Sequence, residues 1–339
     1  VLVTGAGGSI GHELSKQIIN LKPKKLILYE MHEYSLFKSF NNIQSINENQ
    51  KIDVLPILGD LSNNIEILKC LNENKVETLF HAAAYKHVKL VEENITQSFI
   101  NNVISTYNLV KCLRDSSVKN FVLISTDKAV RPSSIMGATK RICEKIIINT
   151  SLITDIKREI NFSIVRFGNV LNSSGSAIPI FQKQIDNGGP ITVTDERATR
   201  YFMSIEEASE LVIQSSGLDK KFGIYLLEMG KPVKIIDIAK KMILLNGKKI
   251  FTSESKKNEN SIKIIFTGLQ KGEKIFEELF IENTTLDTKH PKIKLSKEIN
   301  EFNRELNEQI EILIFDQNIS DKKIINFLNK FVENFINEK

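Results

Sequence analysis

The sequence predicts an α/β protein: a Rossmann-type doubly wound parallel sheet with a smaller C-terminal substrate-binding domain. Short, continuous apolar runs alternate with longer amphipathic segments over the first half of the chain, which is typical of parallel strands covered by helices on both faces. The first apolar run leads directly into a glycine-rich turn and a helical pattern. After about Asn169 this alternation ends, and Gly, Ser and Pro become frequent.

Strands and helices follow one another in order along this pattern. We expect the strands at the apolar runs 1–4, 25–29, 52–57, 78–81, 121–125 and 162–167. We expect the intervening helices within 10–21, 34–49, 63–73, 94–116 and 138–150. Beyond them, the pattern predicts a helix over 204–215, a strand over 225–228 and a helix over 234–245.

These elements divide the chain into three predicted parts. We expect residues 1–170 to form a dinucleotide-binding domain, with 204–240 returning to it. Residues 171–203 and 241–283 are expected to form the substrate domain. Residues 284–339 are rich in Asn, Lys, Glu and Ile and carry no site-like motif, so we expect a peripheral helical tail.

The composition limits the possible classes of function. Apolar residues make up 41% and charged residues 26% of the 339 residues, which is ordinary for a soluble domain. The formal charge of +5 is spread along the chain, whereas nucleic-acid binding needs basic residues gathered on one face, so we expect no nucleic-acid partner. The cysteines and histidines show no metal-ligand spacing, which predicts no metal site and a reducing, cytoplasmic setting.

The first residues of the chain bear on its possible location. No apolar run reaches the roughly 18 residues of a membrane span, and no signal peptide is visible. The chain opens on Val1 without a Met, and its first residues already have the pattern of a core strand. We therefore expect a piece of a longer protein, with room for a membrane-attached N-terminal region outside it.

The segment VLVTGAGGSIGHEL is the sharpest local signal for a ligand. Its glycines fall at Gly5, Gly8 and Gly11, after a strand and at the start of a helix. Gly5 permits the tight turn, Gly8 lets the backbone approach a pyrophosphate, and Gly11 lets the helix pack closely on the strand. The pyrophosphate would lie against the N–H groups and the positive dipole end of that helix. The same glycines could serve a turn alone, but the strand–turn–helix context favours dinucleotide binding.

Two acidic residues follow the next two strands. Glu30 ends the run LILYE, about 20 residues beyond the glycines, where a carboxylate bonds the adenosine ribose hydroxyls. A carboxylate there repels a 2′-phosphate, so the sequence favours NAD over NADP; the alternative is a solvated strand end. Asp60, in GDL, could bond the adenine edge or simply cap a helix.

Thr126, Asp127 and Lys128 follow the fifth predicted strand. A doubly wound fold binds its ligands outside the carboxyl ends of its strands. These three residues put a hydroxyl, an acid and a cation side by side at such an end. The position therefore favours a reaction centre over a plain surface turn.

A longer set of segments, in one order from Val1 to about Leu279, carries a family resemblance. The segments are TGAGGSIG, GDL, FHAAAYKHV, NNVISTYNL, STDKAVRPSSIMGATK, VRFGNVLNSSGSAIPIF, ATRYFMSIEEA, MGKPVKIIDIA and GEKIFEEL. On these segments the chain resembles the extended short-chain dehydrogenase/reductase superfamily and, more closely, the sugar-nucleotide 4,6-dehydratases of bacterial polysaccharide and glycoprotein biosynthesis. The resemblance implies NAD as the cofactor. It also implies the conversion of UDP-N-acetylglucosamine to its 4-keto-6-deoxy derivative.

One position departs from the wider superfamily. The superfamily active site reads Tyr-x-x-x-Lys, whereas this chain has Met136 and Lys140 at that spacing. A thioether cannot act as an acid or a base. In the branch that this chain resembles, Met is usual at this position, Thr-Asp-Lys carries the chemistry, and the configuration at C5 is retained.

The resemblance implies a role for each residue of the centre. Asp127 would be the acid for the C6 oxygen and Lys128 the base for the C5 hydrogen, which would need a lysine pKa depressed by burial or by a nearby cation. Lys140 would hold the nicotinamide ribose, and Thr126 is a candidate relay for the C4 hydroxyl proton. The cofactor contacts expected with them are Gly5, Gly8, Ser9, Ile10, Gly11, Glu30, Asp60, Leu61, Ala82, Ala83 and Lys140.

The resemblance also implies contacts to the substrate. They are expected at Lys86, His87, Asn102, Asn169, Arg200 and Glu273. Asn102 would brace the catalytic strand, and the planar fork of Arg200 suits a diphosphate. Two departures flank the expected nucleotide site: Asp195-Glu196 stands where relatives usually show His-Pro, and Gln270-Lys271 stands where they usually show Arg-Pro.

The sequence leaves two rival functions open. A UDP-N-acetylhexosamine C4 epimerase would use the same hydride step but needs no acid for C6, so the Asp127-Lys128 pair disfavours it. A catalytically inactive dinucleotide-sensing protein is suggested by the missing Tyr, but the intact Thr126-Asp127-Lys128 run and Lys140 disfavour it. The expected partners are a sugar nucleotide and further copies of the chain in a homo-oligomer.

Overall fold

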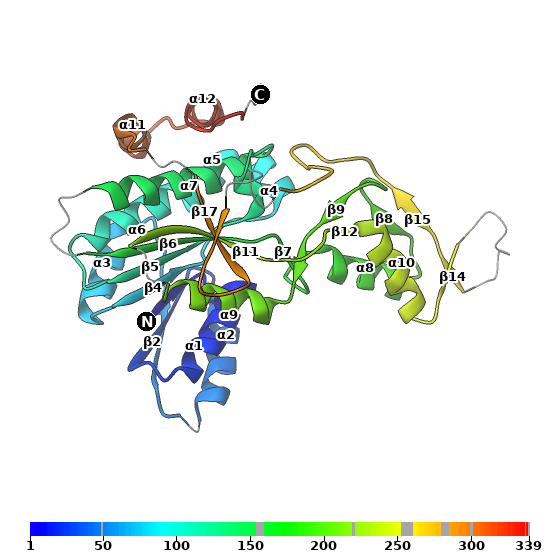
Figure 1. Ribbon diagram of the computed structural model, residues 1–339, viewed down its shortest axis with the longest axis horizontal. Coiled ribbons are helices and arrows are strands. Elements are labelled where there is room, and N and C mark those ends of the chain that lie inside the picture. Colours follow the sequence, from blue (N-terminus) through cyan, green and yellow to red (C-terminus); the bar gives the residue numbers. More distant parts are fainter. Residues whose placement is uncertain are drawn as a thin grey trace.

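The structure, a computed structural model, describes residues 1–48, 50–153, 159–218, 221–251, 260–278, 285–298, 301–335 and 337. A larger part is built on one sheet, and a smaller lobe extends from one side of it (Figure 1). The domain boundary expected between residues 283 and 284 lies outside the described residues.

Parallel strands form the centre of the larger part. Among the described residues, one sheet has nine strands in the order β16-β17-β11-β6-β5-β4-β1-β2-β3. Its parallel members are β1 Leu2–Thr4, β2 Lys25–Glu30, β3 Asp53–Leu58, β4 Thr78–His81, β5 Asn120–Ile124, β6 Asn161–Arg166 and β11 Phe222–Leu227. The chain runs outward from β1 in one direction and from β4 in the other, so a crevice forms at their carboxyl ends. This confirms the predicted Rossmann-type doubly wound sheet.

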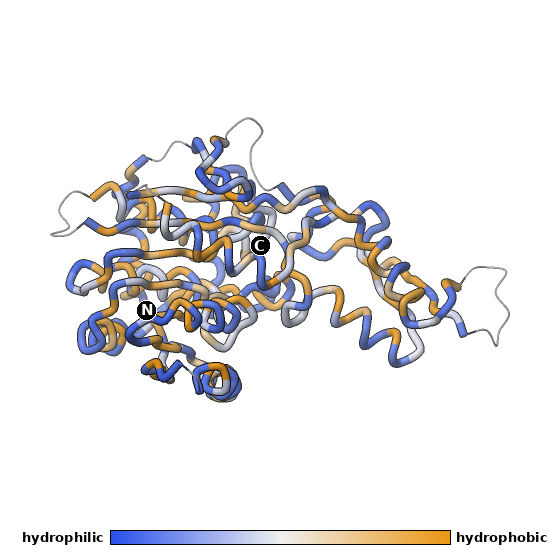
Figure 2. Tube along the Cα trace, turned by 60° about the horizontal axis from the view of Figure 1, so that its bottom comes forward, coloured by the Kyte–Doolittle hydropathy of each residue, from blue (hydrophilic) through white to orange (hydrophobic). Residues whose placement is uncertain are grey.

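Helices cover both faces of the sheet (Figure 1). One face carries α1 Ser9–Asn20, α2 Glu33–Asn47 and α9 Ile205–Ser215, and its core includes Leu14, Leu36 and Leu211. The other face carries α3 Asn64–Glu73, α4 Val88–Glu93, α5 Ile95–Phe99, α6 Ser105–Leu113 and α7 Ile135–Leu152. Hydrophobic stretches of the trace cross the middle of the larger part (Figure 2). No helix in the described ranges has an apolar stretch long enough to cross a membrane.

The smaller lobe has a core of its own. Phe181, Ile185, Ala239 and Ile243 pack together between two helices and short strands. These elements are α8 Ala177–Asp186, α10 Ile235–Leu245, β8 Ile191–Val193, β13 Lys249–Ile250, β14 Ser261–Ile262 and β15 Ile264–Phe266. Two short ladders lie at the junction: β7 Asn169–Val170 pairs with β10 Phe202–Met203, and β9 Thr199–Arg200 pairs with β12 Val233–Lys234.

The helix expected over 94–116 is interrupted. A π-helical turn, Ile100–Ile104, separates α5 from α6. Such a turn fits one extra residue into the helix and often lies at a functional site. Here it carries Asn102, whose buried side chain holds the loop that follows β4.

The tail differs from the expected peripheral helices. β16 Thr285–Asp287 and β17 Ile293–Ser296 form antiparallel strands, and β17 pairs with β11 at the edge of the main sheet. Ile293 and Leu295 alternate with more exposed residues, a two-residue period that is short enough to be hidden among the lysines. The prediction of helix was therefore wrong for this stretch.

The helices that follow are α11 Arg304–Phe315 and α12 Asp321–Phe331. Leu306 and Ile310 of α11, and Ile324 and Leu328 of α12, are buried in the same core as α6 and α7. Each pair has the four-residue spacing that puts side chains on one helix face. The tail is thus part of the core of the larger part and not peripheral to it.

A buried ion-pair cluster fixes the strands next to the crevice. Arg166 at the end of β6 is fully buried, and its Nε and Nη2 each donate to Glu144 of α7 at 2.7 Å. Burial acts to raise the pKa of Glu144, but Arg166 outweighs it and holds this pKa at about 2. Glu144 also accepts a hydrogen bond of 2.6 Å from Ser125, directly after β5. The cluster therefore anchors the residue that precedes Thr126.

Candidate active site

A cleft of about 1020 Å³ opens along the carboxyl ends of the parallel strands. Its lining brings together many of the residues expected in the site: Gly5, Gly8, Ser9, Ile10, Gly11, Glu30, Asp60, Leu61, Ala82, Ala83, Lys86, His87, Thr126, Lys128, Met136, Lys140 and Asn169. Four others lie outside this lining, namely Asp127, Asn102, Arg200 and Glu273. The cleft also includes Ser173, Ser174 and Gly175, which the sequence did not single out as site residues.

The glycine turn fits a group that approaches the backbone closely. Gly5 has φ +65°, and a Cβ there would lie 2.7 Å from the backbone of Ala83. A Cβ on Gly11 would lie 2.1 Å from the Gly5 carbonyl oxygen, so these two glycines are required by the fold itself. A Cβ on Gly8 would meet only that oxygen, at 3.2 Å, although Gly8 lines the cleft. The space in front of Gly8 is thus left open for a ligand at the start of α1.

Glu30 already has backbone partners in the protein. Its Oε2 accepts a hydrogen bond from Gly7 N at 3.0 Å, and its Oε1 accepts from Met31 N and His32 N at 3.0 Å each. Glu30 therefore ties the glycine turn to the end of β2, which sequence reasoning did not foresee. Asp60 accepts from Ser62 N at 2.8 Å. Both carboxylates border the cleft and have the position expected for contacts to an adenosine.

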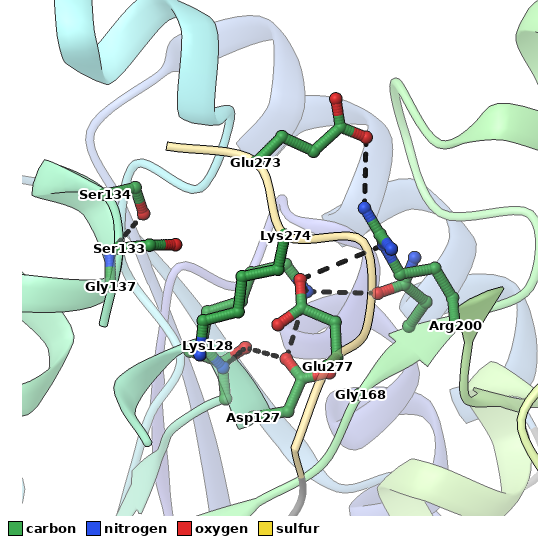
Figure 3. A network of polar contacts seen from close by, with 12 residues as sticks. Asp127, Lys128, Ser133, Ser134, Gly137, Gly168, Arg200, Glu273, Lys274 and Glu277 are labelled. Atoms are coloured by element: carbon green, nitrogen blue, oxygen red, sulfur yellow. Dashed lines mark hydrogen bonds and ion pairs between the residues drawn. The ribbon is translucent and has the colours of Figure 1, made fainter. Parts of the chain in front are cut away.

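Thr126, Asp127 and Lys128 lie in direct contact at the end of β5. Figure 3 shows Asp127 and Lys128 side by side. Thr126 Oγ1 donates to Asp127 Oδ1 at 2.8 Å, and Lys128 Nζ donates to the same oxygen at 3.0 Å. Lys128 Nζ also donates to Asn169 Oδ1 at 3.2 Å. Asp127 is fully buried, and in the described part of the chain its Oδ2 has no hydrogen-bond partner. The Asp127 carboxylate therefore connects to the cleft through its hydrogen bonds with Thr126 and Lys128, which both line it.

Electrostatics at Lys128 differ from what a base was expected to need. Burial acts to lower the pKa of Lys128, but Asp127 and Glu277 outweigh it, so this pKa lies above the ordinary value for lysine. The expectation of a depressed pKa was wrong because two carboxylates, and not a cation, lie closest to the ammonium. Burial does lower the pKa of Lys140, and burial followed by the charge of Lys128 lowers that of Lys86.

Asn102 does not brace the catalytic strand and does not line the cleft. Its Oδ1 accepts from Tyr85 N at 2.7 Å, and its Nδ2 donates to Tyr85 O at 3.0 Å and to Thr139 Oγ1 at 3.2 Å. It therefore holds the loop after β4 against α7, the helix that carries Met136 and Lys140. Asn102 lies in the π-helical turn and touches α7 through Thr139. It therefore affects the site indirectly, through the position of α7.

Arg200 and Glu273 form an ion pair beside the cleft. Arg200 Nη2 donates to Glu273 Oε1 at 3.0 Å, and Thr194 donates to the same oxygen at 2.9 Å. Arg200 also lies 3.8 Å, through Nε, from Glu277 Oε1. Sequence reasoning missed Glu277, although it lies within the quoted GEKIFEEL segment. Its burial distinguishes it from Glu278, which is only partly buried.

The two departures near the expected nucleotide site have modest structural roles. Asp195 pairs with the side chain of Arg197 at 2.9 Å on the surface. Gln270 N donates to Glu273 Oε2 at 3.3 Å. Neither replaces a contact of the Thr126–Lys128 centre. Among the described residues there is no group of His, Cys, Asp and Glu side chains arranged to hold a metal ion.

Comparisons with known proteins give a family profile and several named relatives. A family profile described as "Polysaccharide biosynthesis protein" matches residues 1–298. "Capsular polysaccharide biosynthesis protein CapD" of Staphylococcus aureus is 42% identical over 97% of this chain and 53% of its own length. "UDP-N-acetylglucosamine 4,6-dehydratase (inverting)" of Campylobacter jejuni is 32% identical over 63% of this chain and 62% of its own length. The chain thus spans about half the length of the first curated relatives that it matches.

Solved structures show the same fold. The X-ray structure of Pen from Bacillus thuringiensis is 29% identical, with a TM-score of 0.75 over 87% of this chain and 85% of that chain. The dTDP-glucose 4,6-dehydratase DesIV from Streptomyces venezuelae, solved with NAD bound, is 17% identical, with a TM-score of 0.68 over 82% of this chain and 87% of that chain. At that identity the second likeness concerns the fold alone.

The open space in front of Gly8 generates a prediction. Gly8→Val should abolish dinucleotide binding and leave the protein folded, because its side chain would point into the cleft and its backbone has ordinary extended angles. Gly11→Ala should instead destabilise the fold, since its Cβ would overlap the Gly5 carbonyl. Calorimetric titration with NAD and thermal unfolding distinguish the two effects. Gly217→Val is the control, because a Cβ there would meet only Gln214 O, at an ordinary contact distance of 3.7 Å. NAD binding by Gly8→Val at parental affinity would contradict the assignment of the cleft.

Proposed function

The chain belongs to the polysaccharide biosynthesis protein family, and on that premise we propose that it is an NAD-dependent UDP-N-acetylglucosamine 4,6-dehydratase. The observation that carries the proposal is the contact of a hydroxyl, a carboxylate and an ammonium at Thr126, Asp127 and Lys128, beside a cleft with a dinucleotide-type glycine turn. A relative named as this dehydratase supports the choice of substrate, and the open space in front of Gly8 supports a dinucleotide cofactor.

The dehydration needs an acid for the C6 oxygen and a base for the C5 hydrogen. Bound NAD would supply the hydride acceptor for C4 and the hydride donor for C6. A ketone at C4 makes the C5 hydrogen acidic, so a base can remove it while the C6 hydroxyl leaves as water. The C4 hydroxyl releases one proton, and the departing C6 oxygen takes one up, so a single carboxylate can serve both steps.

Thr126 and Asp127 are placed to carry out these two proton transfers. Thr126 borders the cleft, and its hydroxyl donates to Asp127 Oδ1 at 2.8 Å. A proton from the C4 hydroxyl passes to Thr126 as Thr126 gives its own proton to Asp127, and the reverse transfer protonates the C6 oxygen. The buried position of Asp127 shields this proton from solvent.

Lys128 is the base for the C5 hydrogen in this proposal. It borders the cleft beside Thr126, and Asn169 and Asp127 hold its Nζ. The amine takes the C5 proton only after it has lost its own, and the pKa of Lys128 is raised. Turnover should therefore increase with pH as the free amine becomes populated.

We also propose that the configuration at C5 is retained. Met136 is almost fully buried at the superfamily tyrosine position and cannot exchange a proton with C5. Lys128 then removes and returns the C5 proton from one face of the sugar. The relatives named as inverting are 31–32% identical, and the match covers 62% of their own length. The proposal of retention therefore depends on Met136 and not on these relatives.

The direct test of the proposed function is the product formed from UDP-N-acetylglucosamine with NAD. We expect a UDP-4-keto-6-deoxy-N-acetylhexosamine with the parental C5 configuration as the first product in a proton NMR time course. Formation of UDP-N-acetylgalactosamine would show a C4 epimerase. An inverted 5-epimer as the first product would contradict retention, and no turnover would contradict an enzymatic role with this substrate.

A substitution separates the acid step from binding. Asp127→Asn keeps the shape of the side chain but cannot donate an acidic proton, so dehydration should slow by about 10²–10⁴-fold while UDP-sugar and NAD still bind. Lys128→Met should have the same effect by removing the base. Single-turnover absorbance and product NMR measure both variants. Met136→Tyr is the matched comparison and should gain little; dehydration at the parental rate by Asp127→Asn would remove Asp127 from the mechanism.

A further inference from the structure

Glu277 is a buried carboxylate to which the proposed chemistry assigns no role. Its side chain is 3% exposed, and its Oε1 lies 3.5 Å from Lys128 Nζ and 3.8 Å from Arg200 Nε. In the described residues its Oε2 has no hydrogen-bond partner. A buried carboxylate is costly unless cations lie beside it. Here those cations are Lys128 from the larger part and Arg200 from the junction with the lobe.

The segment that carries Glu277 is fixed on both sides of the site. Lys274 Nζ donates to Val130 O at 3.0 Å, and Ser133 Oγ donates to Gly272 O at 3.0 Å, which holds the segment to the loop after β5. Arg200 Nη1 donates to Ile275 O at 3.2 Å, which holds it to β9. Figure 3 shows this segment crossing in front of Asp127 and Lys128, with Glu277 directed toward them.

We propose that Glu277 is a positioning residue that acts through Lys128, holding its ammonium next to Asp127 and Asn169. The inference rests on the proposed dehydratase function, in which Lys128 is the base. Without Glu277, the Lys128 ammonium would keep only its hydrogen bonds to Asp127 and Asn169, which follow the neighbouring strands β5 and β6. With it, the ammonium lies between carboxylates from two separate segments of the chain.

The other charges around Lys128 define what Glu277 adds. Asp127 precedes it, Arg200 faces it from β9, and Lys86 faces it from the loop after β4. Arg200 opposes the positive charge of Lys128, whereas Asp127 and Glu277 favour it. Removing the charge of Glu277 should therefore lower the pKa of Lys128 and release Arg200 from one of its two carboxylate partners.

The test compares Glu277→Gln with the parent. In protein made with carbon-labelled lysine, the NMR titration of Lys128, assigned with Lys128→Met, should shift to lower pH in Glu277→Gln. The ascending limb of the kcat profile should move in the same direction. The plateau kcat should fall on the order of 10²-fold, as for a catalytic group displaced by about 1 Å. The affinity for UDP, measured by calorimetry, should stay within threefold or increase, so the loss lies in kcat and not in KM.

Two matched variants separate positioning from structural damage. Glu277→Asp keeps the charge and should keep the titration of Lys128 at or near its parental pH. Glu278→Gln removes the same charge one residue later, from an exposed side chain that pairs with Arg131 at 3.2 Å, and should behave as the parent. An unchanged Lys128 titration and pH profile in Glu277→Gln would overturn the proposal, as would a more than tenfold loss of UDP affinity. Absence of product from the parent would instead refute the proposed function, because the NMR titration does not depend on turnover.

Discussion

The rest of the site depends on the ion pairs that the Lys128 ammonium makes with two carboxylates. The ammonium lies 3.0 Å from Asp127 and 3.5 Å from Glu277, and the two carboxylates come from segments about half the chain apart. Charge attraction in a buried setting is strong only where both partners are held in place, since burial also removes the hydration of each. The strands, the π-helical turn and the crossing segment can be understood as parts that hold these groups together.

That requirement explains the ionic and polar anchors around the crevice. Glu144 connects Arg166 of β6 to Ser125, directly before Thr126, so the end of β5 has a fixed position. Asn102 holds the loop after β4 against α7, which fixes the helix that carries Met136 and Lys140. These groups are buried, and removal of one partner of a buried ion pair costs about 3–5 kcal/mol. The order of the proposed site and the stability of the fold therefore depend on the same contacts.

Much of this could be predicted from the sequence, for identifiable reasons. Continuous apolar runs and the spacing of Gly5, Gly8 and Gly11 are local patterns, and they led to the confirmed doubly wound sheet. The strand around Ile293 was missed because its two-residue period is short and lies among lysines. The role of Asn102 was misjudged because its partners, Tyr85 and Thr139, are contacts of the fold and not of the local sequence.

The electrostatics of Lys128 could not be predicted in the same way. The pKa of a lysine depends on which charges surround it, and Glu277 is distant in sequence from Lys128. The residue types of the centre could be read from the strand end alone, whereas the raised pKa of Lys128 depends on the position of Glu277, in a segment beyond the lobe. A sequence pattern thus predicted which groups meet at the strand end, and the three-dimensional arrangement raises the pKa of Lys128 among them.

The central claim is an internal hydride transfer from C4 to C6 of one sugar nucleotide. The most direct measurement uses UDP-N-acetylglucosamine with deuterium at C4, incubated with the protein and NAD and followed by NMR of the product. The account predicts deuterium at C6 of the 4-keto-6-deoxy product, with no net accumulation of reduced cofactor. Loss of the deuterium to solvent, or its recovery at C4 of an epimer, would contradict it.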